Sequence, residues 1–214
     1  MFEAFFFDMD GTLLDTEILW VEAVELVAAA HGYSVSREES LDMVYGIAWP
    51  EVYAKFRNRF PELSWSMEEM GAMLAPYFLE LRSSRDVRIH GTIALIERLA
   101  ATHPVAVVSG SYKADIEAGI AIAGVGDKIS FYLGHEDYAP GKPHPACYML
   151  AAQRAGVPPE RCVVFEDSSA GIQAAKDAGA KGVALARPGR PAQDLSRADL
   201  VLDDLSRFQA SMLA

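Results

Sequence analysis

The stretch FFFDMDGT, residues 5–12, places two carboxylates and a glycine directly after a short apolar run. An apolar run of this kind is typical of a parallel strand buried on both faces. If Asp8 ends such a strand, Asp10 lies on the same side two residues later, and Gly11 lets the backbone turn sharply. Two charges about 4 Å apart repel by ~4 kcal/mol at an effective dielectric constant of about 20. The pair therefore needs a cation, or one carboxyl group must hold a proton.

A calcium-binding loop is the first alternative for these carboxylates. Such a loop requires a third oxygen ligand before its glycine and a glutamate at its twelfth position. Here Gly11 follows Asp10 at once, and the twelfth position is Leu19. The calcium loop is therefore excluded.

Three more apolar runs along the chain are each followed by polar or acidic residues. They are Val105–Val108 before Ser109, Phe131–Leu133 before Gly134 and the more distant Lys142, and Cys162–Phe165 before Glu166. Helical patterns fill 112–123, 145–155 and 169–178, and each is followed by a glycine. This alternation predicts right-handed βαβ units and an α/β fold with a doubly wound, Rossmann-like parallel sheet. The carboxyl ends of its strands, where ligands bind in such sheets, would gather the polar residues at one edge.

The alternation is absent from residues 16–86, which we predict to be mainly helical, with helices at 16–30, 37–44, 49–60 and 67–81. Because this insert directly follows the first strand motif, we expect a small α-helical cap domain over the carboxyl edge of the sheet. The alternative is that the insert only enlarges the core. The predicted domains are an α/β core domain, residues 1–15 and 87–214, and a cap domain, residues 16–86.

Ser109-Gly110-Ser111 offers a hydroxyl group and backbone N–H groups at the start of a helix, which suits a phosphate oxygen. An ordinary helix N-cap explains the same residues equally well. The sequence of this segment alone does not decide between the two interpretations.

Lys142 precedes Pro143, which biases the lysine toward an extended backbone. A lysine in a fixed extended turn suits a point-charge contact with phosphate, although a single lysine is usually a surface charge. Glu166 and Asp167 precede the last predicted βα turn. The helix dipole favours an acidic residue near a helix start, but it does not explain a pair whose partners lie on other strands.

Together these segments resemble the conserved motifs of the haloacid dehalogenase superfamily of phosphotransferases. The matching motifs are D-x-D-G-T at 8–12, Ser109 after a valine-rich strand, Lys142-Pro143, and Glu166-Asp167-Ser168-x-x-Gly171. They occur in the order of the family and span most of the chain outside residues 16–86. The likeness is greatest to the β-phosphoglucomutase-like subgroup, whose members carry a small helical cap after the first motif.

The resemblance implies that Asp8 is the nucleophile and that Asp10 protonates the leaving oxygen and then activates water. It implies Mg²⁺ as the cofactor. The implied ligands are Asp8, the Asp10 carbonyl, Asp167 and, directly or through water, Glu166.

For the substrate, the resemblance implies that Ser109 and Lys142 bind the transferring phosphoryl oxygens. Gly110, Ser111 and Thr12 are further candidates for binding it. In the cap, Gly46 and Trp49 lie where the subgroup's cap approaches the phosphate, although packing within the cap explains such residues at least as well. The predicted function is a Mg²⁺-dependent phosphatase that hydrolyses a small phosphate monoester through an aspartyl-phosphate. The substrates that are usual in this subgroup suggest a sugar phosphate.

Three alternatives remain. Mutases of the subgroup carry a cap histidine where Trp20 stands and a cap arginine where Trp49 stands, so we favour a phosphatase over a mutase. Dehalogenases of the superfamily lack the second aspartate of the D-x-D pair, which is Asp10 here. A catalytically silent binding or regulatory protein is disfavoured because every expected motif residue is present.

The 214 residues carry a formal net charge of -11, which argues against nucleic acid or an anionic membrane as the partner. We expect a small phosphorylated metabolite as the partner instead, with the attraction for phosphate supplied locally by the metal ion.

No secretory signal or membrane-spanning segment is visible, so we expect a cytoplasmic protein, and a monomer. Cys147 and Cys162 are predicted to be buried free thiols. Residues 205–213 are predicted to form a closing helix.

Overall fold

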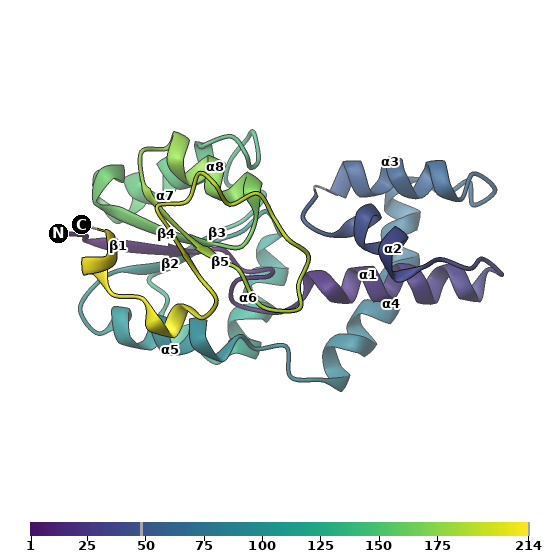
Figure 1. Cartoon of the computed structure of the whole chain (residues 1–214), viewed down its shortest axis with the longest axis horizontal. Coiled ribbons are helices and arrows are strands. Elements are labelled where there is room, and N and C mark those ends of the chain that lie inside the picture. The colour runs from purple at the N-terminus through teal and green to yellow at the C-terminus, as the bar shows by residue number, and fades with distance from the viewer. Residues whose placement is uncertain (48, 214) are drawn as a thin grey trace. The chain divides into compact units, whose positions relative to one another are not determined.

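The computed structural model describes residues 1–47 and 49–213 and is shown in Figure 1. The chain forms two compact units, one of residues 1–14 and 88–214 and the other of residues 15–87. We call them the α/β unit and the helical unit and describe each by itself. That the helical unit acts as a cap stays a prediction.

The α/β unit contains a six-stranded sheet in the order β3-β2-β1-β4-β5-β6, and every neighbouring pair is parallel. The strands are β1 Ala4–Phe7, β2 Val105–Val108, β3 Phe131–Leu133, β4 Cys162–Glu166, β5 Lys181–Leu185 and β6 Leu200–Leu202. The chain starts in the middle of the sheet and builds outward in both directions, which confirms the doubly wound α/β fold.

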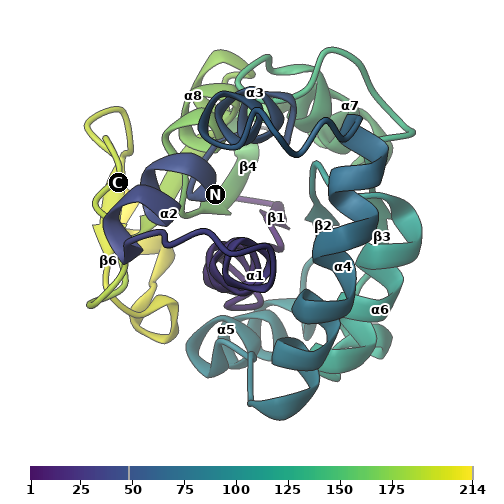
Figure 2. The same cartoon turned by 90° about the vertical axis from the view of Figure 1, so that its right-hand side faces the viewer.

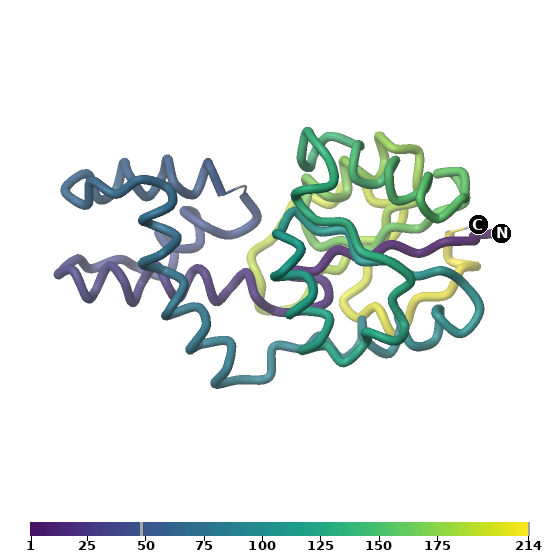
Figure 3. The backbone as a smooth tube through the Cα atoms, turned by 180° about the vertical axis from the view of Figure 1, so that it is seen from behind, coloured from purple at the N-terminus to yellow at the C-terminus, as the bar shows by residue number. Residues whose placement is uncertain are grey.

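Within the described residues of this unit, four α-helices and four short 3-10 helices accompany the sheet. They are α5 His90–Ala100, α6 Lys113–Ala123, α7 Ala146–Ala155, α8 Ser169–Asp177, η1 Gly126–Lys128, η2 Pro159–Arg161, η3 Leu205–Arg207 and η4 Ala210–Leu213. Figures 1 and 3 show α7 and α8 on one face of the sheet and α5 and α6 on the other. The predicted glycine stops are present at Gly124 and Gly156, which end α6 and α7 in the left-handed conformation.

The core of the α/β unit is built on β1, whose four residues are at most 2% exposed. Phe6 packs into a cluster with residues of α7 and α8, while Phe5 and Phe7 stack on Phe165 of β4. Cys147 and Cys162 are buried and free, as predicted. A continuous apolar strand is therefore covered on both faces, as the sequence of β1 requires.

The prediction of a single closing helix at residues 205–213 is wrong. The segment forms η3 and η4, and Phe208 between them has an extended backbone. Its ring is buried and meets Phe165 edge to face, with the ring centroids 5.0 Å apart. Anchoring this ring in the core interrupts the helical turn.

The helical unit consists of α1 Glu17–Ala30, α2 Arg37–Val44, α3 Trp49–Arg59 and α4 Met67–Ser84. These are the four helices that the sequence predicts, and α4 runs three residues further than expected. α1 packs against α2 and α4, and Figure 2 views α1 along its axis. Complete capping boxes define two helix starts, with Ser36 and Glu39 at α2 and Ser66 and Glu69 at α4.

The chain leaves the α/β unit at Leu14 and returns to it at Arg88. These two residues form an isolated antiparallel bridge, and the Ile89 N–H donates a hydrogen bond to the Leu13 carbonyl at 3.0 Å. The two segments at which the chain leaves and re-enters the α/β unit are therefore adjacent. None of the helices in the described parts of the chain is long and apolar enough to span a membrane.

Candidate active site

Asp8, Glu166 and Asp167 form a buried acidic cluster at the carboxyl ends of β1 and β4. The register of the two strands pairs Phe7 with Phe165, so the acidic residues follow the strands side by side. One carboxylate oxygen from each residue lies within 4.8 Å of the others. The three residues are only 7%, 1% and 8% exposed. Segments far apart in the sequence therefore bring three carboxylates together.

Lys142 enters this cluster from the segment that follows β3. Its Nζ lies 2.7 Å from Asp8 Oδ1 and 2.6 Å from Glu166 Oε1, and it donates a third hydrogen bond to the Val108 carbonyl at 3.1 Å. The lysine side chain is 12% exposed. The structure thus brings the predicted nucleophile and the predicted phosphate-binding lysine into direct contact.

Electrostatics in the cluster favour a permanent positive charge on the lysine. Burial alone would lower the pKa of Lys142, but the carboxylates of Asp8 and Glu166 raise that pKa well above its ordinary value. Burial raises the pKa of the Asp8 carboxyl well above its ordinary value, and repulsion from Glu166 adds to this effect. The single ammonium group offsets only one carboxylate charge, so full ionisation of all three carboxyl groups requires a further cation.

This donor set fits a divalent metal ion. Carboxylate oxygens are the ligands that Mg²⁺ prefers, and an ion among them would favour their charged forms. The turn after β1 leaves room for one of these carboxylates, because a Cβ atom on Gly11 would lie 2.1 Å from Asp167 Oδ2. Gly11 also has a φ of +92°, a conformation that favours glycine. The sequence motif therefore uses its glycine both for the turn and for the approach of Asp167.

Glu166 is held by four hydrogen bonds. Its Oε1 accepts from Lys142 and, at 2.8 Å, from the buried Tyr148 hydroxyl. Its Oε2 accepts from the backbone N–H and the hydroxyl of Ser168 at 3.3 and 3.0 Å. The Lys142 ammonium also lies 5.2 Å from the centre of the Tyr148 ring. Glu166 is therefore a firmly oriented counter-ion of Lys142.

Tyr148 was missed by the sequence analysis. It lies within the apolar helix α7, and nothing in its spacing distinguishes it from a core residue. Tyr138 is a second such residue, since its hydroxyl donates to the Ser109 carbonyl at 2.7 Å. Burial raises the pKa of the Tyr138 hydroxyl, so it stays a proton donor.

Asp10 lies beside Ser111, whose hydroxyl donates a hydrogen bond to Asp10 Oδ2 at 2.8 Å. Ser109 is 2% exposed, and its Oγ accepts from the Ser111 N–H at 3.1 Å. An added side chain at Gly110 would meet only open space. Thr12 is fully buried, and its hydroxyl donates to Asp167 Oδ1 at 3.3 Å. The structure therefore places Thr12 in support of the acidic cluster.

The chain is similar in sequence and fold to known proteins, and the relatives described below are covered over more than nine tenths of their own length. The family model for haloacid dehalogenase-like hydrolases matches residues 2–179. The chain belongs to this family. It is 30% identical to validoxylamine A 7'-phosphate phosphatase of Streptomyces hygroscopicus subsp. limoneus, over 98% of this chain and 97% of the relative. It is 31% identical to fructose-1-phosphate phosphatase YqaB of Escherichia coli strain K12, over 83% and 93% of the two chains.

Among solved structures, CbbY from Rhodobacter sphaeroides in complex with phosphate superposes with a TM-score of 0.80 at 27% identity. The match covers 100% of this chain and 99% of that one. The prediction of a haloacid dehalogenase-like hydrolase from the ordered motifs is therefore confirmed.

Two predicted substrate-binding residues of this hydrolase, Gly46 and Trp49, belong to the helical unit. Gly46 has a φ of +73° just after α2, and Trp49 begins α3. The Trp49 ring meets Trp20 with the centroids 5.2 Å apart, and Trp20 stacks on Phe78 at 4.0 Å. Trp49 is thus part of an aromatic cluster within its own unit, and the roles of Gly46 and Trp49 in binding stay predictions.

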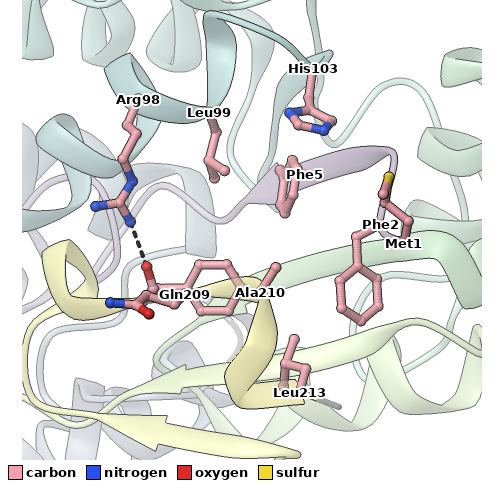
Figure 4. A pocket seen from close by; sticks show the side chains of 10 residues that line it. Met1, Phe2, Phe5, Arg98, Leu99, His103, Gln209, Ala210 and Leu213 are labelled. Atoms are coloured by element: carbon pink, nitrogen blue, oxygen red, sulfur yellow. Dashed lines mark hydrogen bonds between the residues drawn. The ribbon is translucent and has the colours of Figure 1, made fainter.

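A pocket of about 770 Å³ lies near the amino ends of β1 and β2, and Figure 4 shows the side chains that line it. Phe5 of β1 and His103, which precedes β2, line it together with Leu99 and Leu213. Its lining is mainly apolar and contains none of the predicted site residues. The acidic cluster therefore lies at the opposite edge of the sheet from this pocket.

Proposed function

We propose that the protein is a Mg²⁺-dependent phosphatase that hydrolyses a small phosphate monoester through an aspartyl-phosphate on Asp8. The observation that carries this proposal is the contact of Asp8 with Lys142 inside the buried acidic cluster. A nucleophile, a fixed cation and spare negative charge for a metal ion are together what phosphoryl transfer requires. The relatives that are named phosphatases support the same reaction.

The proposed reaction has two displacements at phosphorus. An Asp8 carboxylate oxygen attacks the phosphorus, the bond to the ester oxygen breaks, and Asp10 gives a proton to the departing alcohol. Water then attacks the phosphorus and gives a proton to Asp10. The bond between phosphorus and Asp8 breaks, its electron pair returns to the carboxylate, and inorganic phosphate leaves.

Lys142 and the Ser109 segment bind the phosphoryl oxygens in this scheme. Asp8, Asp167 and the Asp10 carbonyl would hold Mg²⁺, with Glu166 contributing directly or through water. When bound, the ion would offset the negative charge of the carboxylates and of the transferring phosphoryl group.

We infer a small sugar phosphate as the substrate. The names of the relatives support this choice, since one is a fructose-1-phosphate phosphatase and another acts on the phosphate of validoxylamine A. The helical unit would then act as a cap over the site and determine which ester binds, with Gly46 and Trp49 as its proposed contacts. That the enzyme is a cytoplasmic monomer stays an expectation from the sequence.

The test is a phosphate-release screen over metabolite phosphates with Mg²⁺, run beside Asp8→Asn and in EDTA. We expect turnover of at least one sugar phosphate, and none in EDTA or in the variant. Rapid quenching followed by mass spectrometry should find a phosphoryl group on the peptide that contains Asp8. Undiminished phosphate release in EDTA or by the variant would refute the proposal.

A sugar-phosphate mutase is the second candidate function. Such an enzyme interconverts isomers and depends on a bisphosphate primer, whereas a phosphatase releases inorganic phosphate. Trp20 and Trp49 pack against one another where mutases of the subgroup carry a histidine and an arginine. This apolar pair favours hydrolysis, and an assay for both products separates the two activities.

A further inference from the structure

We propose that Ser111 is a positioning residue that aims the Asp10 carboxyl group at the leaving oxygen of the substrate. The loop of residues 134–137, which follows the edge strand β3, would hold Ser111 in place for this task. The inference rests on the proposed function, because it needs Asp10 as the proton donor. It assigns a role to residues outside the motifs that define the family resemblance.

All three polar groups of Ser111 are engaged. Its hydroxyl donates to Asp10 Oδ2 at 2.8 Å, and its N–H donates to Ser109 Oγ at 3.1 Å. Its carbonyl accepts from the His135 N–H at 2.9 Å. The backbone of Ser111 is therefore held on both sides, which fixes the position from which its hydroxyl reaches Asp10.

The loop of residues 134–137 docks on the start of α6 through its acidic side chains. Both carboxylate oxygens of Glu136 accept a hydrogen bond from the Lys113 N–H at 3.1 Å, at the first residue of the helix. The Asp137 carboxylate forms an ion pair with Lys113 Nζ at 2.6 Å and accepts from the Gly134 N–H. Glu136 thus serves as a helix cap supplied by a different loop, where the helix dipole favours a negative charge.

The close approach of the two loops leaves little room for a side chain at position 134. A Cβ atom there would lie 3.0 Å from the Ser111 carbonyl oxygen and 3.1 Å from Lys113 Cγ. The segment that carries Ser111 and the loop after β3 therefore pack tightly against one another. A side chain at this position would press against the Ser111 carbonyl and the Lys113 side chain, which would have to give by a few tenths of an ångström.

This arrangement matters for one step of the reaction. In the first displacement the bond from phosphorus to the ester oxygen breaks, and the proton from Asp10 neutralises the alkoxide as it departs. General acid catalysis of this kind contributes about 10²–10⁴-fold and depends on geometry. A hydroxyl group that fixes one oxygen of Asp10 leaves the other oxygen a defined direction for proton donation.

The experiment compares two leaving groups in the Mg²⁺-loaded enzyme. For glycerol phosphate, whose alcohol is a poor leaving group, we expect Ser111→Ala to lower kcat/KM by about 10- to 100-fold, a part of the general acid contribution. For p-nitrophenyl phosphate, whose phenolate leaves without a proton, we expect a loss below about threefold, because little acid catalysis is at stake. The comparison uses kcat/KM because this quantity reports on the first displacement and not on hydrolysis of the aspartyl-phosphate.

Two further variants connect the effect to the proposed geometry. Ser111→Thr retains a hydroxyl group and should therefore keep most of the activity with glycerol phosphate that Ser111→Ala loses. Glu136→Gln weakens the contact with α6 and should show the same leaving-group pattern with a smaller loss. Ser196→Ala changes an exposed serine of the α/β unit and is the matched control. It should leave kcat/KM unchanged for both substrates. A crystal structure of Ser111→Ala should show the Asp10 carboxyl group in a different orientation.

The outcomes separate the inference from the proposed function. Asp10→Asn should show the strongest leaving-group dependence. If it shows none, both the acid role and the positioning role are wrong. If Asp10→Asn shows the dependence but Ser111→Ala loses equal activity with both substrates, or with neither, the positioning role alone is wrong.

Discussion

The acidic cluster of the α/β unit and the capping glutamates of the helical unit lie in opposite surroundings. In the α/β unit, Asp8, Glu166 and Asp167 are buried together, and the lysine among them offsets one of their charges. In the helical unit, Glu39 and Glu69 lie at exposed helix starts, where each completes a capping box. Burial raises the pKa of Asp8, so its charged form is disfavoured in the folded chain, whereas the capping contacts lower the pKa of Glu39 and of Glu69 and favour their charged forms. Acidic groups held at a cost mark the candidate site, because a structural role does not explain them.

The largest expected effect is that of Asp8→Asn in the α/β unit. The substitution removes the proposed nucleophile and should lower phosphate release by at least about 10³-fold. At neutral pH it should also raise the unfolding midpoint of the metal-free protein. The raised pKa of Asp8 means that the charged carboxylate is less favourable in the folded chain than in the unfolded chain. Calorimetry in EDTA measures this change, and a lower midpoint would contradict the idea that the cluster costs stability.

Metal binding should reverse that cost. At a Mg²⁺ concentration of about 100 times Kd, an ion bound only by the folded protein stabilises it by about 2.7 kcal/mol. We therefore expect the unfolding midpoint of the wild-type protein to rise with Mg²⁺, and that of Asp167→Asn to respond much less. The comparison is made by thermal unfolding without substrate. An equal rise in both proteins would mean that Asp167 does not hold the ion.

In the helical unit, loss of a cap should lower stability without affecting chemistry directly. Ser66→Ala removes the hydroxyl that accepts from the Glu69 N–H, and we expect it to cost about 1 kcal/mol. Ser64→Ala changes an exposed serine in the same loop and serves as the control. Denaturant unfolding and hydrogen exchange at α4 measure the difference. Equal stability of the two variants would show that the capping box contributes little.

The smallest expected effect is a pH dependence of the capping boxes. The Ser36 backbone N–H and hydroxyl lower the pKa of Glu39, and Ser66 does the same for Glu69. Because the folded pKa lies below the unfolded one, this contribution is complete above the unfolded pKa of about 4.3 and is lost as the pH falls through the folded value. Carboxyl NMR titration should find both groups below their ordinary pKa. Ser66→Ala keeps the backbone N–H that lowers the pKa of Glu69 most, so it should raise that pKa only part of the way toward its ordinary value and leave the pKa of Glu39 unchanged.

The parts of the molecule that were predictable share a strong local signal. An apolar run that ends in a carboxylate specifies both a buried strand and the edge at which its last residue lies. Parallel pairing of Phe7 with Phe165 is then enough to bring Asp8 and Glu166 together. The helix boundaries at Gly124 and Gly156 were equally clear, because each glycine adopts a conformation that other residues avoid.

The parts that were missed depend on packing between distant segments. Nothing near Tyr148 in the sequence indicates that its hydroxyl reaches Glu166, since this contact depends on how α7 packs on the sheet. Ser111 is likewise held by a residue more than twenty positions away, since its carbonyl accepts from the His135 N–H. Strand β6 is short and its middle residue is exposed, so its sequence lacks the continuous apolar run of the inner strands. Two short turns replaced the predicted closing helix because Phe208 is anchored in the core.

The bridge between Leu14 and Arg88 has a consequence for how this architecture can change. Directly opposed residues in an antiparallel pair have Cα atoms only about 5 Å apart. Excision of residues 15–87 would leave two chain ends that a tight turn can rejoin, with every strand of the sheet still in place. The junction is therefore a suitable site for replacing the insert with one of another length or fold, because the order and connections of the strands would stay the same.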